Sequence, residues 1–295
     1  MAGKADHLKN MQTDLAQGKE WEAIVGRTLG GVPTPETFPH RHLGDMTVPW
    51  LNGLYVEAKR DSWVDTSKRV CLEFADFSKR QSFAQVSGVF KHRALDLLLN
   101  HQSIVVHSLG DAMNWCYVYS TVEVMDLLTR VTEARRSLGR YGARGWYMQT
   151  WNSDWGVTGG MLVPTSQRTD YDHPDGVRRK FPHPAKAFRL CHIDQLRDTV
   201  AQVADQAHTM AATMNTGDPL TVYRNMVDVF MPNSDDSNNP NNEYYAYKGA
   251  VNIQKVAQTR HHFMGTLTDL RPKGHAELAR LHQVSDSSSL GTMAA

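Results

Sequence analysis

Two acidic residues and a lysine in the first fifth of the chain have the types and spacing for metal-assisted chemistry. Asp45 is followed twelve residues later by Glu57-Ala58-Lys59. Side chains alternate along a strand, so Glu57 and Lys59 share one face while Ala58 points to the other. Paired carboxylates supply the oxygen ligands that Mg²⁺ prefers, and a nearby lysine can position water or stabilise charge on a phosphate. The pattern is therefore typical of phosphodiester hydrolysis, in which a metal polarises the phosphate and activates water.

A predicted β-hairpin brings these residues together. Residues 43–48 and 54–59 have the apolar pattern of strands, and Asn52-Gly53 between them is a strong signal for a hairpin turn. We therefore expect Asp45 to lie on the same face as Glu57 and Lys59. The run of apolar residues that leads into Glu57 favours a strand inside a sheet, where a charged side chain is costly unless it has a function.

The segments around the hairpin predict a mixed α/β fold, because strands and helices alternate along the chain. Thr121 is expected to cap a helix that begins at Val122. The other expected elements are a helix over residues 5–29, a strand over 70–74, a helix over 78–100, strands over 103–109 and 115–120, and a helix over 193–230.

An acid on one strand and an acid-x-lysine on the next resemble the motif of the PD-(D/E)XK nuclease superfamily. Asp45 matches the first acid, Glu57 the second acid and Lys59 the lysine, while Gly44 stands where the motif has proline. The order helix, hairpin, helix, strand, strand is also similar, over about residues 5–138. The resemblance implies a restriction-endonuclease-like fold, with a central mixed sheet flanked by helices. It further implies a Mg²⁺ cofactor, with Mn²⁺ as an alternative, and DNA as the substrate.

The same resemblance implies roles for individual residues. Asp45 and Glu57 would bind the metal, and Lys59 would position the attacking water or the phosphate. Many members carry a further acid on the first helix, a place that Glu20 and Glu22 both suit, and Glu22 is the candidate metal ligand there. Glu73, on the next predicted strand, is another. The competing interpretation is a chance match, since surface strands often alternate charged residues.

The chain is nearly balanced in charge, with 32 Lys and Arg against 31 Asp and Glu. This total excludes a uniformly basic or acidic polyelectrolyte, but residues 141–189 hold 7 basic against 4 acidic residues, a net charge of +3. Basic residues among aromatic ones suit phosphate contact and base stacking. Aromatic core residues with solvated arginines are an equal alternative. The predicted DNA contacts are Arg60, Arg135, Arg136, Arg140, Arg144, Arg178, Arg179, Lys180, Lys186 and Arg189.

The composition along the chain divides it into successive regions, with a mainly helical extension after the core. Methionine-rich helices in the last third are candidates for a homodimer interface. The expected regions are a catalytic core over 1–140, a basic and aromatic segment with helices over 141–231, a linker over 232–243, helices over 244–284 and a disordered tail over 285–295.

Other protein classes are not expected. No apolar run approaches the ~20 residues of a membrane span, and the N-terminus lacks the apolar core of a signal peptide. The three cysteines, Cys71, Cys116 and Cys191, are widely spaced, which favours a reducing compartment over a structural zinc site. The sequence thus predicts a cytoplasmic, metal-dependent deoxyribonuclease, in a bacterial or phage-infected cell and of restriction or phage endonuclease type. The alternative is a non-catalytic nucleic-acid-binding or phage structural protein that retains the nuclease-like core.

Overall fold

The chain divides into two compact units that interleave along the sequence. The first unit comprises residues 1–72, 96–131 and 162–216, and the second comprises residues 73–95, 132–161 and 217–295. The predicted division at residue 140 stays a prediction of the sequence. The computed structural model describes residues 2–34, 44–52, 54–61, 64, 69–78, 103–138, 146–152, 156–164, 170–172, 178–180, 187–213, 225 and 229–230. The predicted linker over 232–243, the helices over 244–284, the tail over 285–295 and residues 79–100 of the predicted helix over 78–100 lie outside these residues.

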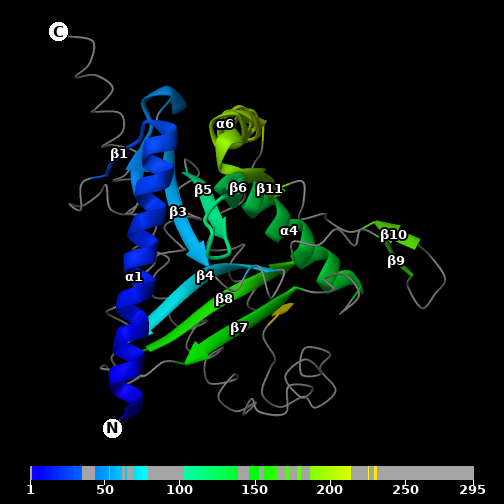
Figure 1. The fold of residues 1–295 in the computed structure, drawn as a ribbon. Helices are drawn as coiled ribbons and strands as arrows, with labels where there is room; N and C mark the ends of the chain where they lie inside the picture. Colours follow the sequence, from blue (N-terminus) through cyan, green and yellow to red (C-terminus); the bar gives the residue numbers. More distant parts are fainter. Residues whose placement is uncertain are drawn as a thin grey trace. The chain divides into compact units, whose positions relative to one another are not determined.

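A mixed six-stranded sheet forms the centre of the first unit (Figure 1). Its strands lie in the order β1-β2-β3-β5-β6-β11; β3 and β5 are parallel, and every other neighbouring pair is antiparallel. The predicted mixed α/β class is confirmed. The strands are β1 (Val32–Pro33), β2 (Met46–Thr47), β3 (Tyr55–Asp61), β5 (Ser103–Leu109), β6 (Trp115–Ser120) and β11 (Arg189–His192).

The predicted hairpin is the antiparallel pair β2–β3, in which Met46 lies opposite Val56. The connection is longer than a two-residue turn, because a 3-10 helix over Pro49–Leu51 precedes the turn. Proline fixes its own φ and lacks an N–H, which suits the first position of a helix. Asn52 then reverses the chain in the left-handed conformation, with φ 50° and ψ 46°.

Helix α1 (Ala2–Leu29) runs alongside β3 (Figure 1). Trp21, Val25 and Leu29 recur at every fourth position, so they form one stripe on the helix, and all three are fully buried. The indole Nε1 of Trp21 donates a hydrogen bond to the carbonyl oxygen of Val106 on β5, at 3.1 Å. This buried contact fixes α1 against the middle of the sheet.

Helix α6 (Leu196–Thr213) packs against β6 and β11. A short 3-10 helix, Ile193–Gln195, leads into it from β11. The buried α6 residues Leu196, Val200 and Val203 belong to the same core as the buried stripe of α1. On β3, Val56 and Ala58 belong to that core, so α1 and α6 cover the face of the sheet on which these two residues lie. Side chains alternate along a strand, and Glu57 and Lys59 therefore lie on the opposite face.

Helix α4 (Thr121–Leu138) begins with a capping box. The amide of Glu123 donates to Ser120 Oγ at 3.2 Å, and the amide of Ser120 donates back to Glu123 Oε2 at 3.3 Å. Ser120 is thus the cap. The sequence-based assignment of Thr121 was wrong, because the Thr121 hydroxyl instead donates to the carbonyl oxygen of Ser103 on the neighbouring strand.

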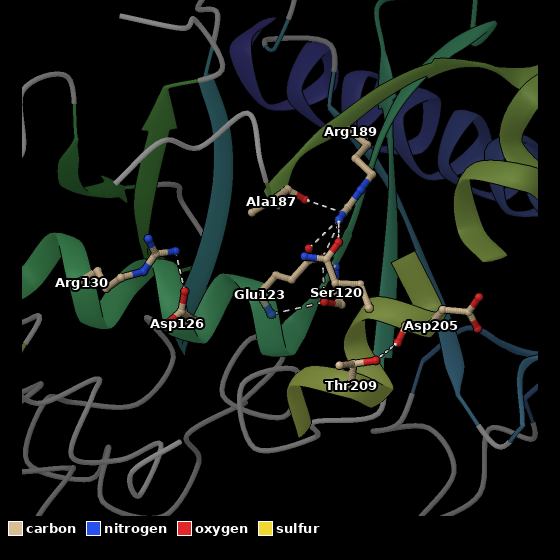
Figure 2. A network of polar contacts seen from close by, with 9 residues as sticks. Ser120, Glu123, Asp126, Arg130, Ala187, Arg189, Asp205 and Thr209 are labelled. Carbon is tan, nitrogen blue, oxygen red and sulfur yellow. Dashed lines mark hydrogen bonds and ion pairs between the residues drawn. The ribbon is translucent and has the colours of Figure 1, made fainter. Parts of the chain in front are cut away.

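A buried ion pair ties the start of α4 to β11 (Figure 2). The guanidinium of Arg189 contacts both carboxylate oxygens of Glu123, at 2.7 and 3.1 Å, and also donates to Gln206 on α6. The Glu123 side chain is only 4% exposed. Arg130 and Asp126 on the same helix form a contrasting pair near the surface, with the Arg130 side chain 52% exposed.

The region after α4 contains strands that its sequence pattern did not predict. A three-stranded sheet in the order β4-β8-β7 holds most of the described strands of the second unit, and β9 pairs with β10 in the first. Among the described residues, no helix has the length and apolar character needed to cross a bilayer. The bounds are β4 (Arg69–Ser78), β7 (Tyr147–Asn152), β8 (Gly156–Pro164), β9 (Asp170–Asp172) and β10 (Arg178–Lys180).

Removing one partner of the buried ion pair should destabilise the protein strongly. We expect Arg189→Met to lower the free energy of unfolding by about 3 kcal/mol, because it leaves the Glu123 carboxylate buried without its cation. Arg130→Met is the matched control, since exposed pairs contribute about 0.5 kcal/mol or less. Urea unfolding measures both. Adding Glu123→Leu to Arg189→Met should recover much of the loss; equal effects of the two single variants would contradict this assignment.

Candidate active site

The hairpin register sets Asp45 against Glu57. Met46 pairs with Val56 in the antiparallel ladder, so one residue further on Asp45 lies opposite Glu57. Because β2 begins only at Met46, the Asp45 side chain takes over the hydrogen bonding of the neighbouring strand. Its Oδ2 accepts a hydrogen bond from the amide of Ala58 at 2.8 Å. This bond satisfies a buried backbone donor and holds the carboxylate beside β3.

Lys59 and Glu57 form an ion pair on the face of the sheet opposite the core that α1 and α6 cover. Lys59 Nζ lies 2.6 Å from Glu57 Oε1, and the two side chains are 31% and 15% exposed. Two residues apart on a strand, they point to the same side of the sheet, as the sequence predicts. The pairing partly neutralises Glu57 and leaves Asp45 as the less compensated carboxylate.

The Asp45 carboxylate is held in a place that disfavours its charge. Burial, followed by the negative charge of Glu57, raises the pKa of Asp45 from 3.8 to about 7. The Glu22 carboxylate raises this pKa further, whereas the hydrogen bond from Ala58 and the ammonium of Lys59 lower it. Burial and the neighbouring carboxylates thus oppose ionisation of Asp45, and a cation close to its carboxylate would favour the ionised form.

Glu22 comes to this site from helix α1. It follows Trp21 in the chain and is therefore turned by about 100° from the buried stripe, which leaves it half-buried and near enough to act on Asp45. Glu20 is exposed on the same helix. The sequence left these two residues as alternatives, and the structure brings Glu22 toward the Asp45–Glu57–Lys59 cluster.

Gly44 is required by the close approach of the two strands. Its φ of +140° lies in a region that side-chain-bearing residues rarely adopt. A Cβ atom there would meet the carbonyl oxygen of Val56 at 3.0 Å and the Cβ of Tyr55 at 3.1 Å. Proline, with φ fixed near −65°, could not occupy this backbone conformation. The departure from the proline of the motif therefore has a local steric cause.

Two predicted DNA contacts belong to internal ion pairs. Arg60 alternates with Lys59 along β3 and so points to the opposite face, where its side chain is 6% exposed and contacts Asp111 at 2.8 Å. Arg189 is held by Glu123 as described above. Both guanidinium groups thus have structural partners, and neither lies with the acidic cluster.

None of the described contacts links the remaining predicted site residues to Asp45, Glu57 or Lys59. Arg135 lies over the ring of Phe230, 5.3 Å from its centroid, and Arg136 donates to Asn225 at 3.4 Å. Glu73 lies on β4 in the second unit, and its side chain is outside the described part of the structure. The basic run Arg178, Arg179 and Lys180 forms β10. Arg140, Arg144 and Lys186 lie outside the described residues.

Residues that the sequence did not single out lie beside Lys59. The parallel register places His107 of β5 directly opposite Lys59. His107 is 2% exposed, and its Nδ1 lies 3.3 Å from the hydroxyl of Tyr119 on β6, which is 3% exposed. The strand over 103–109 was predicted with these bounds, but its pairing with β3 carries no local sequence signal. A buried polar pair therefore borders the site on the side away from Asp45.

The donor set fits a hard divalent cation with few protein ligands. Within the described ranges, no group of three or more His, Cys, Asp or Glu side chains is assembled that could enclose a metal. Mg²⁺ is ordinarily held by one or two carboxylates, with water and substrate phosphate completing its octahedron. Asp45 and Glu57, with Glu22 nearby, can supply that number of oxygen ligands.

Comparisons with protein-family models, with curated proteins and with solved structures each returned no match for this chain.

Replacing the Asp45 carboxylate should stabilise the protein when no metal is bound. Because the pKa of Asp45 is about 7 in the folded protein and ordinarily 3.8, the folded state binds more protons between these values and its stability falls as the pH rises through them. Asp45→Asn lacks this loss. In a chelator at pH 8 we expect its melting temperature to exceed that of the wild type by about 3 °C, the shift for ~1 kcal/mol.

The pH dependence separates this effect from general changes in stability. The advantage of Asp45→Asn should shrink as the pH falls from about 7 towards 3.8, because the wild-type carboxyl becomes protonated first in the folded and then in the unfolded state. Asp14→Asn, at an exposed position of α1, is the control and should change little at any pH. A constant difference in melting temperature between Asp45→Asn and the wild type from pH 4.5 to 8 would contradict the raised pKa of Asp45.

Proposed function

We propose that this protein is a metal-dependent nuclease that hydrolyses phosphodiester bonds of DNA. One observation carries the proposal: a β-hairpin sets Asp45 against Glu57 and Lys59, in a half-buried site with uncompensated negative charge. Charged groups that burial and like charges keep in an unfavourable state cluster at functional sites. A purely structural hairpin does not need the charge, since the neutral side chain of asparagine at position 45 also has an oxygen that can accept the hydrogen bond from Ala58.

In this proposal, Asp45 and Glu57 would hold Mg²⁺ or Mn²⁺, and the charge of Glu22, which also acts on Asp45, would add to the attraction. A metal held there would supply Lewis-acid polarisation of the phosphate and a more acidic bound water. The amide of Ala58 keeps the Asp45 carboxylate in place, at 2.8 Å. An ammonium group has three N–H donors, which allows one lysine to orient a carboxylate and stabilise charge on a phosphate together. We assign Lys59 that role.

The topology around the site supports a restriction-endonuclease-like core. Helix α1, the hairpin β2–β3 and the pair β5–β6 follow one another as the superfamily resemblance implies, with β4 between β3 and β5. The expected second helix lies outside the described residues. Because β3 and β5 are parallel, the chain must cross over between them, and such connections need a dozen or more residues. The proposed nuclease class, of restriction or phage type, rests on this order together with the residues of the motif.

For the DNA contacts we retain the basic run on β10 of the first unit. The run Arg178, Arg179 and Lys180 is on a two-stranded ribbon, where register sets Arg178 opposite Asp172 and Lys180 opposite Asp170. Lysine and arginine on such a ribbon can contact phosphates and give salt-dependent affinity. A homodimer and a cytoplasmic location remain predictions of the sequence alone.

The alternative function is nucleic-acid binding without catalysis, or a structural role in a phage. It is favoured by one observation, the lack of a three-ligand group among the described residues. The two functions differ in the fate of bound DNA, so a cleavage assay distinguishes them.

Purified protein with Mg²⁺ or Mn²⁺ should cleave plasmid or linear DNA, and a chelator should abolish the cleavage. Lys59→Ala should reduce the single-turnover rate by about 100-fold or more, since removing one group that stabilises transition-state charge commonly costs this much. Lys19→Ala, at an exposed position of α1, is the matched control for loss of one lysine and should cleave normally. Gel electrophoresis of end-labelled DNA measures the rate.

Equal cleavage by wild type and Lys59→Ala would remove Lys59 from the chemistry. If folded wild-type protein binds DNA but fails to cleave single- and double-stranded substrates with either metal, the non-catalytic alternative holds instead. Circular dichroism and melting curves for each variant separate a loss of chemistry from a loss of folding.

A further inference from the structure

Two of the three cysteines lie side by side in the core of the first unit. Cys116 of β6 and Cys191 of β11 are directly paired in the antiparallel register. Their Sγ atoms are 3.6 Å apart, and the residues are 0% and 3% exposed. They are 75 residues apart in sequence, which hid the pair from sequence analysis. The third cysteine, Cys71, lies on β4.

The backbone around this pair meets the requirements of a disulfide. Residues directly opposite in an antiparallel ladder have Cα atoms about 4.5 to 5.5 Å apart, within the range of about 4.4 to 6.8 Å found for disulfides. A disulfide bond is about 2.05 Å long, so the sulfurs need to approach by roughly 1.5 Å. Rotation of the two side chains can supply this movement while the strands stay paired.

The two thiols are also unequal in acidity. The hydrogen bond with Cys116, opposed by burial and assisted by the Thr199 side chain on α6, lowers the pKa of Cys191 to about 7. The same contact and burial raise the pKa of Cys116. The contact therefore favours Cys191 over Cys116 as the sulfur that loses its proton. The thiolate is the nucleophilic form of cysteine.

We propose that Cys116 and Cys191 are an oxidisable dithiol, which peroxide-class oxidants convert to a disulfide between β6 and β11. The Cys191 thiolate attacks a peroxide oxygen, the O–O bond breaks, and the leaving hydroxide takes a proton to become water. The resulting Cys191 sulfenic acid is then attacked by the Cys116 sulfur, which forms the S–S bond and releases a second water. The two thiols lose two electrons, and the peroxide accepts them.

The disulfide would stabilise the edge of the sheet against unfolding. β11 is the last strand of the six, and it leads through the 3-10 helix into α6. A covalent bond to β6 would close a long loop and restrict the unfolded chain, so the oxidised protein should resist unfolding more than the reduced protein. The active-site residues on β3 take no part, and this inference is independent of the proposed nuclease.

The experiment uses the full chain with Cys71→Ser, so that only the buried pair can react. Because both thiols are buried, the probe is hydrogen peroxide, a small oxidant. After treatment of the folded protein at pH 7.5, we expect the intact mass to fall by two hydrogens and both thiols to resist alkylation after denaturation. Proteolysis without reductant should yield a peptide pair linked through Cys116 and Cys191. The melting temperature should rise by several degrees, and dithiothreitol should reverse every change.

Two variants test the assigned roles of the residues. Cys191→Ser in the same background should lose no hydrogens and gain no linked peptide. Thr199→Val should give the same disulfide severalfold more slowly, because it removes the hydroxyl that helps to stabilise the thiolate. Peptide mapping of the wild-type protein provides the same test without the Cys71→Ser change. The proposal is overturned if both thiols remain open to alkylation after peroxide, or if only oxygen adducts or disulfide-linked dimers form.

Discussion

The candidate site depends on a carboxylate whose charge is disfavoured by burial and by neighbouring carboxylates. Asp45 accepts a hydrogen bond from Ala58 and lies near Lys59, yet burial and the charges of Glu57 and Glu22 still raise its pKa to about 7. Each residue is held by a separate part of the framework, so none can turn away without loss of other contacts. An unfavourable charge that the fold maintains in this way is available to a cation.

The fold fixes these carboxylates through a few close contacts. The buried stripe of α1 and the bond from Trp21 to β5 set the height of Glu22 above the sheet. The φ of +140° at Gly44 allows the chain to pass close to β3 and to turn Asp45 toward Ala58. At the opposite edge of the sheet, the buried pair Glu123–Arg189 anchors α4 to β11. Arg189 thus stabilises the framework, a role that its basic, aromatic surroundings in the sequence did not indicate.

Local sequence patterns predicted the hairpin that carries the site. Which residues from other elements lie beside the hairpin depends on contacts between distant parts of the chain. The alternation of Glu57 and Lys59 and the apolar runs beside Asn52 were enough to predict the hairpin, because both depend on neighbours in the sequence. The choice of Glu22 over Glu20 needed the packing of α1. His107 beside Lys59 and Cys116 beside Cys191 needed the pairing of distant strands, for which a single sequence holds no signal. The strands after α4 were missed because turn residues and aromatic residues interrupt their alternation.

The central claim is that the Asp45–Glu57 pair binds a divalent cation, and Mn²⁺ binding measured by electron paramagnetic resonance tests it most directly. The free Mn²⁺ signal, titrated with protein at pH 8 without DNA, should fall with wild-type protein. The loss should be at least tenfold weaker with folded Asp45→Asn or Glu57→Gln, whereas Asp14→Asn should match the wild type. Equal Mn²⁺ binding by all four proteins, or no binding by the wild type at millimolar Mn²⁺, would contradict the account.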